Sequence, residues 1–239
     1  MSELNGKNIL VVGGSSGIGL EVVKQAASLG AEVWSASRNN TADLQATQAK
    51  FIELDVTSEA IQLDELPDQL DALVYCPGTI NLKLFHRLKV ADFQKDFDVN
   101  VLGAVKVIQA CLPRLKKSDA AAIVTFSTVA VQQGMGFHAS VASAKGAVEG
   151  LSRSLAAELA PQNIRVNCIA PSLTDTPLAG QLLSTPEKRE ASEKRHPIKK
   201  VGKAADLASA AIYLLSAPSE WITGQVWHVD GGMSSVKSL

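Results

Sequence analysis

Glycines near the N-terminus are the first residues whose spacing suggests chemistry. The turn Gly13-Gly-Ser-Ser-Gly-Ile-Gly19 directly follows the apolar run at residues 7–12. Glycine lets backbone approach a ligand closely, and the N–H groups that open a following helix attract phosphate. The glycines are not followed by Lys-Ser/Thr, so a P-loop for a nucleoside triphosphate fits less well than a dinucleotide pyrophosphate. The predicted phosphate-binding residues are Gly13, Ser15, Ser16, Gly17, Ile18 and Gly19, and a purely structural turn is the alternative.

The predicted second strand ends in Ser37 and Arg38. A dinucleotide fold that prefers NAD tends to place Asp or Glu here, where the carboxylate binds the ribose 2′-hydroxyl. This chain has a hydroxyl and a guanidinium instead, and a guanidinium binds phosphate oxygens. We therefore expect NADP(H) in preference to NAD(H). The alternative is a solvated arginine at a strand end.

The elements that must position these residues follow from alternating apolar runs and amphipathic stretches. Strands are expected at residues 7–12, 32–36, 51–54, 71–75, 121–126, 164–169 and 225–229. Helices are expected at residues 17–29, 41–47, 58–66, 90–116 (with a break near 98–100 and a kink at Pro113), 138–159 and 203–215. This alternation predicts an α/β fold with a doubly wound parallel sheet of the Rossmann type, seven strands and helices on both faces. We expect one domain over residues 1–239, with a lid or substrate loop near residues 173–200.

Composition limits the possible partners. Hydrophobic residues make up 46% of the chain, charged residues 20%, and the net charge is -1, so no strong field attracts nucleic acid or an anionic membrane. The sequence shows no signal-peptide pattern and no apolar run near the ~20 residues of a membrane span. Its three cysteines, Cys76, Cys111 and Cys168, lie far apart without metal-ligand spacing. We expect a cytoplasmic protein with no metal, nucleic-acid or membrane partner.

Further motifs, taken in order, resemble the short-chain dehydrogenase/reductase family over essentially the whole chain, and most closely its 3-oxoacyl-carrier-protein reductase and sugar or polyol dehydrogenase types. The matching segments are the glycine turn, Asp55-Val56, Asn100 within DVNVLG, IRVNCIAP at 164–171, Thr176, ITGQ at 222–225 and VDGG at 229–232. The resemblance implies that Asp55 and Val56 contact the adenine and that Lys145 holds the nicotinamide ribose. It also implies cofactor contacts from Cys76, Pro77, Gly78, Pro171, Leu173 and Thr176, and an active-site role for Asn100.

This chain departs from the family at the reaction centre. The family has a Ser, a Tyr thirteen positions later and a Lys four beyond that. Counting back from Lys145 puts Val141 at the tyrosine position and Thr128 at the serine position. The only tyrosines, Tyr75 and Tyr213, belong to other elements. Smaller departures are Val12 for Thr before the glycine turn, Cys76-Pro77-Gly78 for Asn-Ala-Gly, and Ser172 for the glycine after Pro171.

Loss of the tyrosine removes the family's proton donor. Valine has no proton to give, and general acid catalysis is typically worth about 10²–10⁴ in rate. His138 shares a helix face with Val141 and Lys145 and could substitute, as could a water held by Thr128 and Lys145. The alternatives are a surface histidine at the helix start, a solvated Lys145, a helix-bend Asn100 and a strand-end Thr128.

Two functions are consistent with this pattern. One is an oxidoreductase that transfers a hydride between NADP(H) and a carbonyl or alcohol substrate. The other is a catalytically impaired NADP(H)-binding protein that acts as a sensor or partner subunit. The sequence names no substrate, since residues 173–197 show no recognition pattern. Apolar stripes on two long helices and the family resemblance predict a homodimer or homotetramer; the stripes are Val101, Val105, Ile108 and Leu112, and Val148, Leu151, Leu155 and Leu159.

Overall fold

A parallel sheet of seven strands forms the centre of the molecule, as the computed structural model of the chain shows for residues 4–237. The strand order is β3-β2-β1-β4-β5-β6-β9, and every pair is parallel. Their bounds are β1 Asn8–Val12, β2 Glu32–Ser37, β3 Lys50–Glu53, β4 Ala72–Tyr75, β5 Ala121–Phe126, β6 Ile164–Pro171 and β9 Val226–Val229. The predicted fold class is confirmed.

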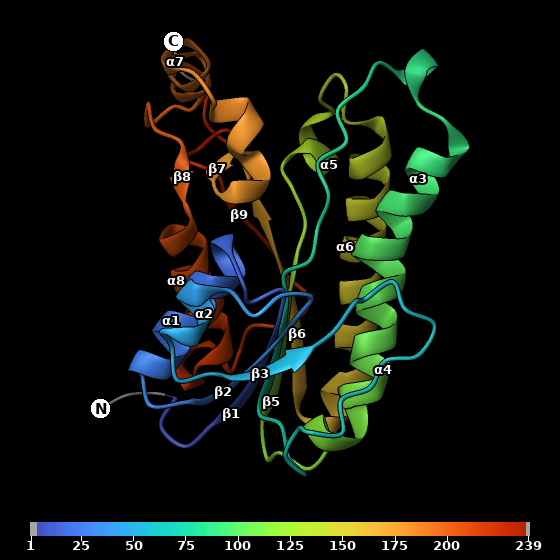
Figure 1. Cartoon of the computed structure of the whole chain (residues 1–239), viewed down its shortest axis with the longest axis vertical. Coiled ribbons are helices and arrows are strands. Elements are labelled where there is room, and N and C mark those ends of the chain that lie inside the picture. Colours follow the sequence, from blue (N-terminus) through green and yellow to red (C-terminus); the bar gives the residue numbers. More distant parts are fainter. Residues whose placement is uncertain (1–3, 238–239) are drawn as a thin grey trace.

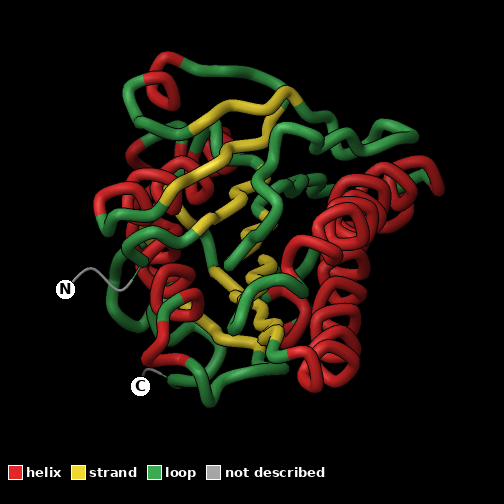
Figure 2. Tube along the Cα trace, turned by 90° about the horizontal axis from the view of Figure 1, so that it is seen from below, coloured by secondary structure: helices red, strands yellow, loops and turns green. Residues whose placement is uncertain are grey.

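Helices cover both faces of this sheet (Figures 1 and 2). On one face lie α1 (Gly17–Ser28), α2 (Ala42–Gln45) and α8 (Ala204–Leu215), and on the other lie α3 (Val90–Phe97), α4 (Gly103–Leu115) and α6 (Ala139–Leu159). Two apolar clusters fill the spaces between sheet and helices. The central strands are buried on both faces, which explains why they appear in the sequence as continuous apolar runs.

The strand order reverses between β1 and β4. Chain connections leave β1 toward β2 on one side, while β4 lies on its other side. In such sheets the crevice for a ligand opens at the carboxyl ends of the strands, at this reversal. Near that edge lie the short α5 (Ala130–Gln133), α7 (Pro186–Arg195) and the two-stranded ribbon of β7 (Thr174–Asp175) and β8 (Gly202–Lys203) (Figure 1).

The helix predicted at residues 58–66 is wrong. The segment is a series of turns in which Leu63 and Leu66 are buried in the core. Asp55 begins it by accepting bonds from the backbone N and the Oγ1 of Thr57, a local pattern that competes with helix formation. Two buried leucines three positions apart fit a helix period, yet here two tight turns bury them equally well.

The predicted break in the long central helix is present as a π-helical turn. Residues Asp98–Leu102 form this turn between α3 and α4, and it contains Asn100. Such turns insert extra backbone into a helix and often accompany functional sites. Among the described residues, no helix is long and apolar enough to cross a membrane.

Candidate active site

The glycine turn joins β1 to α1 at the carboxyl edge of the sheet. Gly13 and Gly17 have φ of +79° and +55°, a left-handed backbone that side chains other than glycine rarely adopt. A Cβ at Gly19 would collide with the carbonyl oxygen of Gly13, so α1 packs directly on the loop. Ser16, which precedes α1, makes no side-chain cap bond to the helix. The first N–H groups of α1 are therefore available to an anion.

Arg38 lies at the end of β2, beside this turn. Its side chain is exposed and forms no ion pair with any carboxylate within residues 4–237. Ser37 before it is buried and donates to the carbonyl of Asn39 at 3.3 Å. The hydroxyl and the N–H of Thr57 donate to Asp55 at 2.7 and 2.8 Å and lower its pKa, to which nearby Arg38 also contributes. An unpaired guanidinium in this place fits a phosphate monoester.

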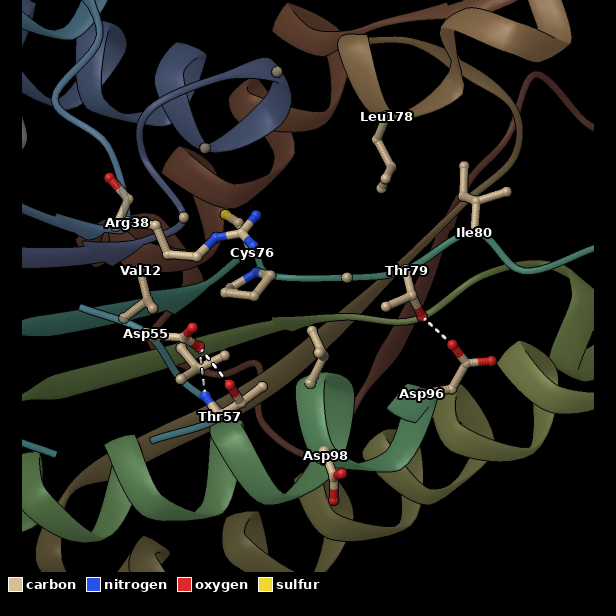
Figure 3. Close-up of a pocket in the computed structure, with 18 of the residues that line it drawn as sticks. Val12, Arg38, Asp55, Thr57, Cys76, Thr79, Ile80, Asp96, Asp98 and Leu178 are labelled. Atoms are coloured by element: carbon tan, nitrogen blue, oxygen red, sulfur yellow. Dashed lines mark hydrogen bonds between the residues drawn. The ribbon is translucent and has the colours of Figure 1, made fainter. Parts of the chain in front are cut away.

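A cavity of about 1050 Å³ runs along the carboxyl edge of the sheet. Figure 3 shows Arg38, Asp55 and Thr57 at one end and Thr79 bonded to Asp96 at the other. Its volume suits a dinucleotide. The cavity brings together most of the residues predicted to bind cofactor: Gly13, Ser15, Ser16, Gly17, Ile18, Gly19, Ser37, Arg38, Asp55, Val56, Cys76, Pro77, Gly78 and Thr176.

A second cavity of about 490 Å³ adjoins the first. The predicted residues that line this cavity and not the first are Thr128, His138, Val141, Lys145, Pro171 and Leu173. Most of its remaining wall is apolar, from side chains such as Ile80, Leu82 and Met135. The two cavities share Ile18, Cys76, Gly78, Thr79, Ile80, Thr176 and Leu178. The two cavities therefore adjoin along this shared wall.

Lys145 lies one helical turn after Val141 on α6. Its side chain is 7% exposed, and its Nζ donates to the carbonyl of Phe126 at 2.8 Å. Burial lowers the pKa of Lys145 to about 8, although Asp96 favours its charge. Burial also raises the pKa of Cys76 to about 12 and that of Cys168 to about 11, so both thiols are neutral near pH 7. A buried ammonium with a pKa near neutrality can hold or release a proton.

His138 and Thr128 both have part of their hydrogen-bonding capacity occupied. His138 precedes α6, and its Nδ1 lies 2.6 Å from the carbonyl of Gly136. Thr128 accepts from the N–H of Ala130 at 3.3 Å, which leaves its hydroxyl hydrogen available. Val141 presents only methyl groups to the cavity. Of these three, only Thr128 and His138 can exchange a hydrogen bond with a ligand there.

Asn100 lines neither cavity and is fully buried. Its Nδ2 donates to the hydroxyl of Thr79 at 2.9 Å and to the carbonyl of Asp96 at 2.7 Å, while its Oδ1 has no hydrogen-bond partner. The buried Asp96 carboxylate accepts from Thr79 at 2.7 Å and from Ser140. Asp96 is not among the residues predicted from the sequence, although its place four residues before Asn100 sets both on one helix face.

A second missed contact joins Ser172 to His196. Ser172 follows β6 and lines the second cavity, and its Oγ lies 2.8 Å from Nε2 of His196 after α7. The imidazole is 1% exposed, and its Nδ1 lies 2.8 Å from the carbonyl of Ser192. The sequence showed Ser172 as a departure from the family's glycine. Its partner 24 positions later has no sequence signal.

Comparisons with known proteins bear on this arrangement. The family described as Enoyl-(Acyl carrier protein) reductase matches residues 12–234. The chain belongs to the short-chain dehydrogenase/reductase family. A tropinone reductase homolog of Arabidopsis thaliana is 33% identical over 97% of this chain and 94% of its own length. The 3-oxoacyl-[acyl-carrier-protein] reductase of Aquifex aeolicus is 30% identical over 97% of this chain and 98% of its own.

Solved structures agree with this family membership. The aldohexose dehydrogenase of Thermoplasma acidophilum superimposes with a TM-score of 0.89 at 26% identity, covering 100% of this chain and 98% of that one. ElxO with NADP bound superimposes with a TM-score of 0.86 at 27% identity, covering 97% of this chain and 100% of that one. Members of the short-chain dehydrogenase/reductase family are oxidoreductases that use NAD(P), so the chain is an oxidoreductase by family.

Proposed function

We propose that this short-chain dehydrogenase/reductase transfers a hydride between NADP(H) and a small carbonyl or alcohol substrate. The observation that carries the proposal is the wall shared by the two cavities, which includes Gly78, Thr79 and Thr176. A dinucleotide along the first cavity would end at this wall, against a substrate in the apolar second cavity. The whole chain would act as one dinucleotide-binding unit, with residues 173–200 as its substrate loop.

The first cavity offers partners for the adenine, the phosphates and the middle of the cofactor, and the second cavity adds those around the nicotinamide. The pyrophosphate would lie on the turn from Gly13 to Gly19, with the hydroxyls of Ser15 and Ser16 beside it. When bound, the nicotinamide supplies or accepts the hydride. The remaining proposed contacts are Asp55 and Val56 for the adenine, Cys76, Pro77 and Gly78 along the middle, Lys145 for the nicotinamide ribose, and Pro171, Leu173 and Thr176 around the nicotinamide.

Arg38 and Ser37 support NADP(H) over NAD(H). The unpaired guanidinium and the adjacent hydroxyl stand where a 2′-phosphate would project, and no carboxylate is present at this strand end to bind a free 2′-hydroxyl. The NADP-bound ElxO structure shows that a protein of this fold accommodates the phosphorylated cofactor.

Val141 takes the place of the family's catalytic tyrosine in this proposal. Thr128 would orient the substrate carbonyl by donating its available hydroxyl hydrogen. Lys145 would hold the cofactor and place its positive charge beside that carbonyl. Asn100 would act indirectly, by donating a hydrogen bond to Thr79, which lines both cavities. His138 would border the substrate cavity. A methyl-lined position supplies no proton, so a group other than residue 141 must give one to the carbonyl oxygen.

A homodimer or homotetramer is the proposed assembly. Of the predicted apolar stripes, Ile108, Val148 and Leu159 are buried in the core. The rest stay partly exposed on the outer helical layer: Val101, Val105, Leu112, Leu151 and Leu155. Apolar side chains left half-exposed on two adjacent helices suit a contact with a second copy.

The proposal is tested by cofactor titration followed by turnover. NADPH should bind saturably in a fluorescence titration, and NADPH should be oxidised only when a carbonyl is present from a panel of aldehydes, cyclic ketones and 3-oxo esters. Saturable binding without oxidation over the whole panel would favour the impaired sensor or partner subunit. No binding of either nicotinamide cofactor at millimolar concentration would contradict both functions.

The cofactor preference is tested with Arg38→Ala. A hydrogen bond to a charged group contributes about 1.5–3 kcal/mol, so the Kd for NADPH should rise about 10- to 100-fold. The Kd for NADH should change less than threefold, since NADH lacks the 2′-phosphate. Arg87→Ala is the matched control, because Arg87 is exposed and lines neither cavity. An equal loss for both cofactors would show that Arg38 does not read the 2′-phosphate.

A further inference from the structure

The hydrogen bond between Ser172 and His196 has a defined direction. His196 Nδ1 lies 2.8 Å from the carbonyl of Ser192, which can only accept, so Nδ1 carries a hydrogen. In the neutral ring Nε2 is then the acceptor, and the Ser172 hydroxyl donates to it across 2.8 Å. When the ring is protonated, Nε2 donates instead and the Ser172 hydrogen is free to turn into the cavity. The contact can therefore pass a proton either way.

Ser172 stands where the reacting carbonyl is expected. The carbonyl of Pro171 accepts from the N–H of Val129 at 3.0 Å, which fixes the end of β6 beside Thr128. Ser172 lines the same cavity as Thr128, Val141 and Lys145, whereas the His196 ring lies behind it and is almost wholly buried. The Ser172 hydroxyl therefore faces the cavity, and the His196 imidazole lies behind that hydroxyl, on the side where the proposed reaction needs a proton.

We propose that Ser172 and His196 together replace the missing tyrosine as the proton donor and acceptor of the reaction. The inference rests on the proposed oxidoreductase function. In reduction, the carbonyl carbon receives the hydride with both its electrons from the reduced nicotinamide, and the C=O π pair becomes a bond from oxygen to the Ser172 proton. Ser172 takes the Nε2 proton of the imidazolium in return. His196 is left neutral and regains a proton from solvent, and oxidation of an alcohol runs the same transfers backward.

The surroundings of His196 carry charges of both signs. They are Glu193 and Arg195 on α7, Lys199 in the turn after it, and Asp230 before the C-terminal turn. Asp230 is held by the N–H groups of Gly232 and Ser234, while Gly231 packs near the ring: a Cβ there would lie 3.5 Å from Cδ2 of His196. The proposed transfer alternates the His196 ring between its charged and neutral forms, so removal of the ring should change the pH dependence of turnover.

A tether between α7 and β6 is the other role this contact could have. A tether would change substrate affinity and stability when broken, but it would leave the pH dependence of the chemical step in place. Two variants separate these roles. His196→Gln retains a hydrogen-bonding side chain but lacks an imidazole that can exchange a proton. Ser172→Thr retains both the hydroxyl and the imidazole.

The test compares Ser172→Ala, Ser172→Gly, Ser172→Thr and His196→Gln with wild type, and uses Ser28→Ala and His86→Gln as controls on exposed residues outside both cavities. Ser172→Ala, Ser172→Gly and His196→Gln should lower kcat for carbonyl reduction about 10²-fold or more, while the Kd for NADPH stays within twofold. Ser172→Thr should keep most of the rate. The kcat dependence between pH 5 and 8 should disappear in His196→Gln and persist in both controls.

A second readout needs neither cofactor nor turnover. Imidazole ¹⁵N NMR of the cofactor-free protein should show the neutral His196 ring protonated at Nδ1, and Ser172→Ala should shift the Nε2 resonance. An Nε2–H tautomer, a kcat within threefold of wild type in Ser172→Ala, or a loss confined to KM would each overturn the inference. A wild type that binds no NADPH or reduces no carbonyl would instead overturn the proposed function itself.

Discussion

Lys145 combines a charged side chain with a position that water hardly reaches. Its pKa falls from 10.5 to about 8 because burial disfavours the ammonium, which corresponds to about 3 kcal/mol against folding at neutral pH. The bond from Nζ to the carbonyl of Phe126 recovers part of this, at about 1 kcal/mol. A residue kept at such a cost to stability is typical of a functional site.

We therefore predict that Lys145→Met stabilises the cofactor-free protein by about 2 kcal/mol at pH 7, net of the lost hydrogen bond. The sign follows from the lowered pKa. Below pH 8 the native wild type buries a charge, and between pH 8 and 10.5 that charge is lost from the native state before the unfolded state. The advantage of the variant should be full below pH 8 and shrink toward pH 10.5.

Urea unfolding of both proteins at pH 7 and pH 10 measures this difference. Lys95→Met is the control, because Lys95 is an exposed lysine on α3 and should show no such pH dependence. An advantage for Lys145→Met that is equal at both pH values would mean that the ammonium is not the source of the instability.

The junction of α3, the π-helical turn and α6 depends on a buried carboxylate. Asp96 of α3 accepts hydrogen bonds from Thr79 and from Ser140 of α6, and Asn100 of the turn donates to Thr79 and to the Asp96 carbonyl. These contacts fix the helix that carries Val141 and Lys145 against the loop after β4. The element that positions the reaction centre is thus tied at its first turn.

Ser140→Ala should lower the free energy of unfolding by about 1–3 kcal/mol, since it leaves a buried carboxylate short of one donor. Ser143→Ala on the same helix is the matched control and should stay within about 0.5 kcal/mol, because its exposed hydroxyl bonds only to the carbonyl of Ala139 in its own helix. Both are measured by urea unfolding at pH 7. Equal effects in the two variants would show that the Asp96 contact does not hold α6.

Elements with a strong local pattern were predicted correctly, and those set by tertiary contacts were not. β4 and β5 are buried on both faces, so their apolar runs identify them without further context. Residues 58–66 show that two leucines at helical spacing can be buried by turns instead. The residue types of the glycine turn and of Arg38 are enough to predict a role in binding phosphate. The roles of Ser172 and Asp96 depend on hydrogen-bond partners that are distant in the sequence and that only the fold brings near.

At the scale of the whole molecule, the outer layer of α4 and α6 keeps several apolar side chains partly exposed. Gly150 lies there on α6 and is exposed, and it precedes the half-buried Leu151. A Cβ at Gly150 would meet nothing within 4 Å, so the single chain does not need glycine at this position. Glycine inside an exposed helix costs about 1 kcal/mol relative to better helix formers. A close approach of a second copy would explain why it is tolerated.

Gly150→Arg distinguishes an effect on the stability of the single chain from an effect on the formation of a dimer or tetramer. In a single chain the variant should be as stable as wild type or more so, by up to about 1 kcal/mol, because arginine favours the helix. In a dimer or tetramer paired through α6, the long charged side chain should block the contact and reduce the mass from light scattering toward one chain of 25.2 kDa. Gly180→Arg is the matched control, at an exposed glycine in the 3-10 helix Pro177–Leu183 before α7, where a Cβ also meets nothing within 4 Å. An unchanged mass in Gly150→Arg would place the contact elsewhere, and a wild-type mass near that of one chain would contradict the assembly altogether.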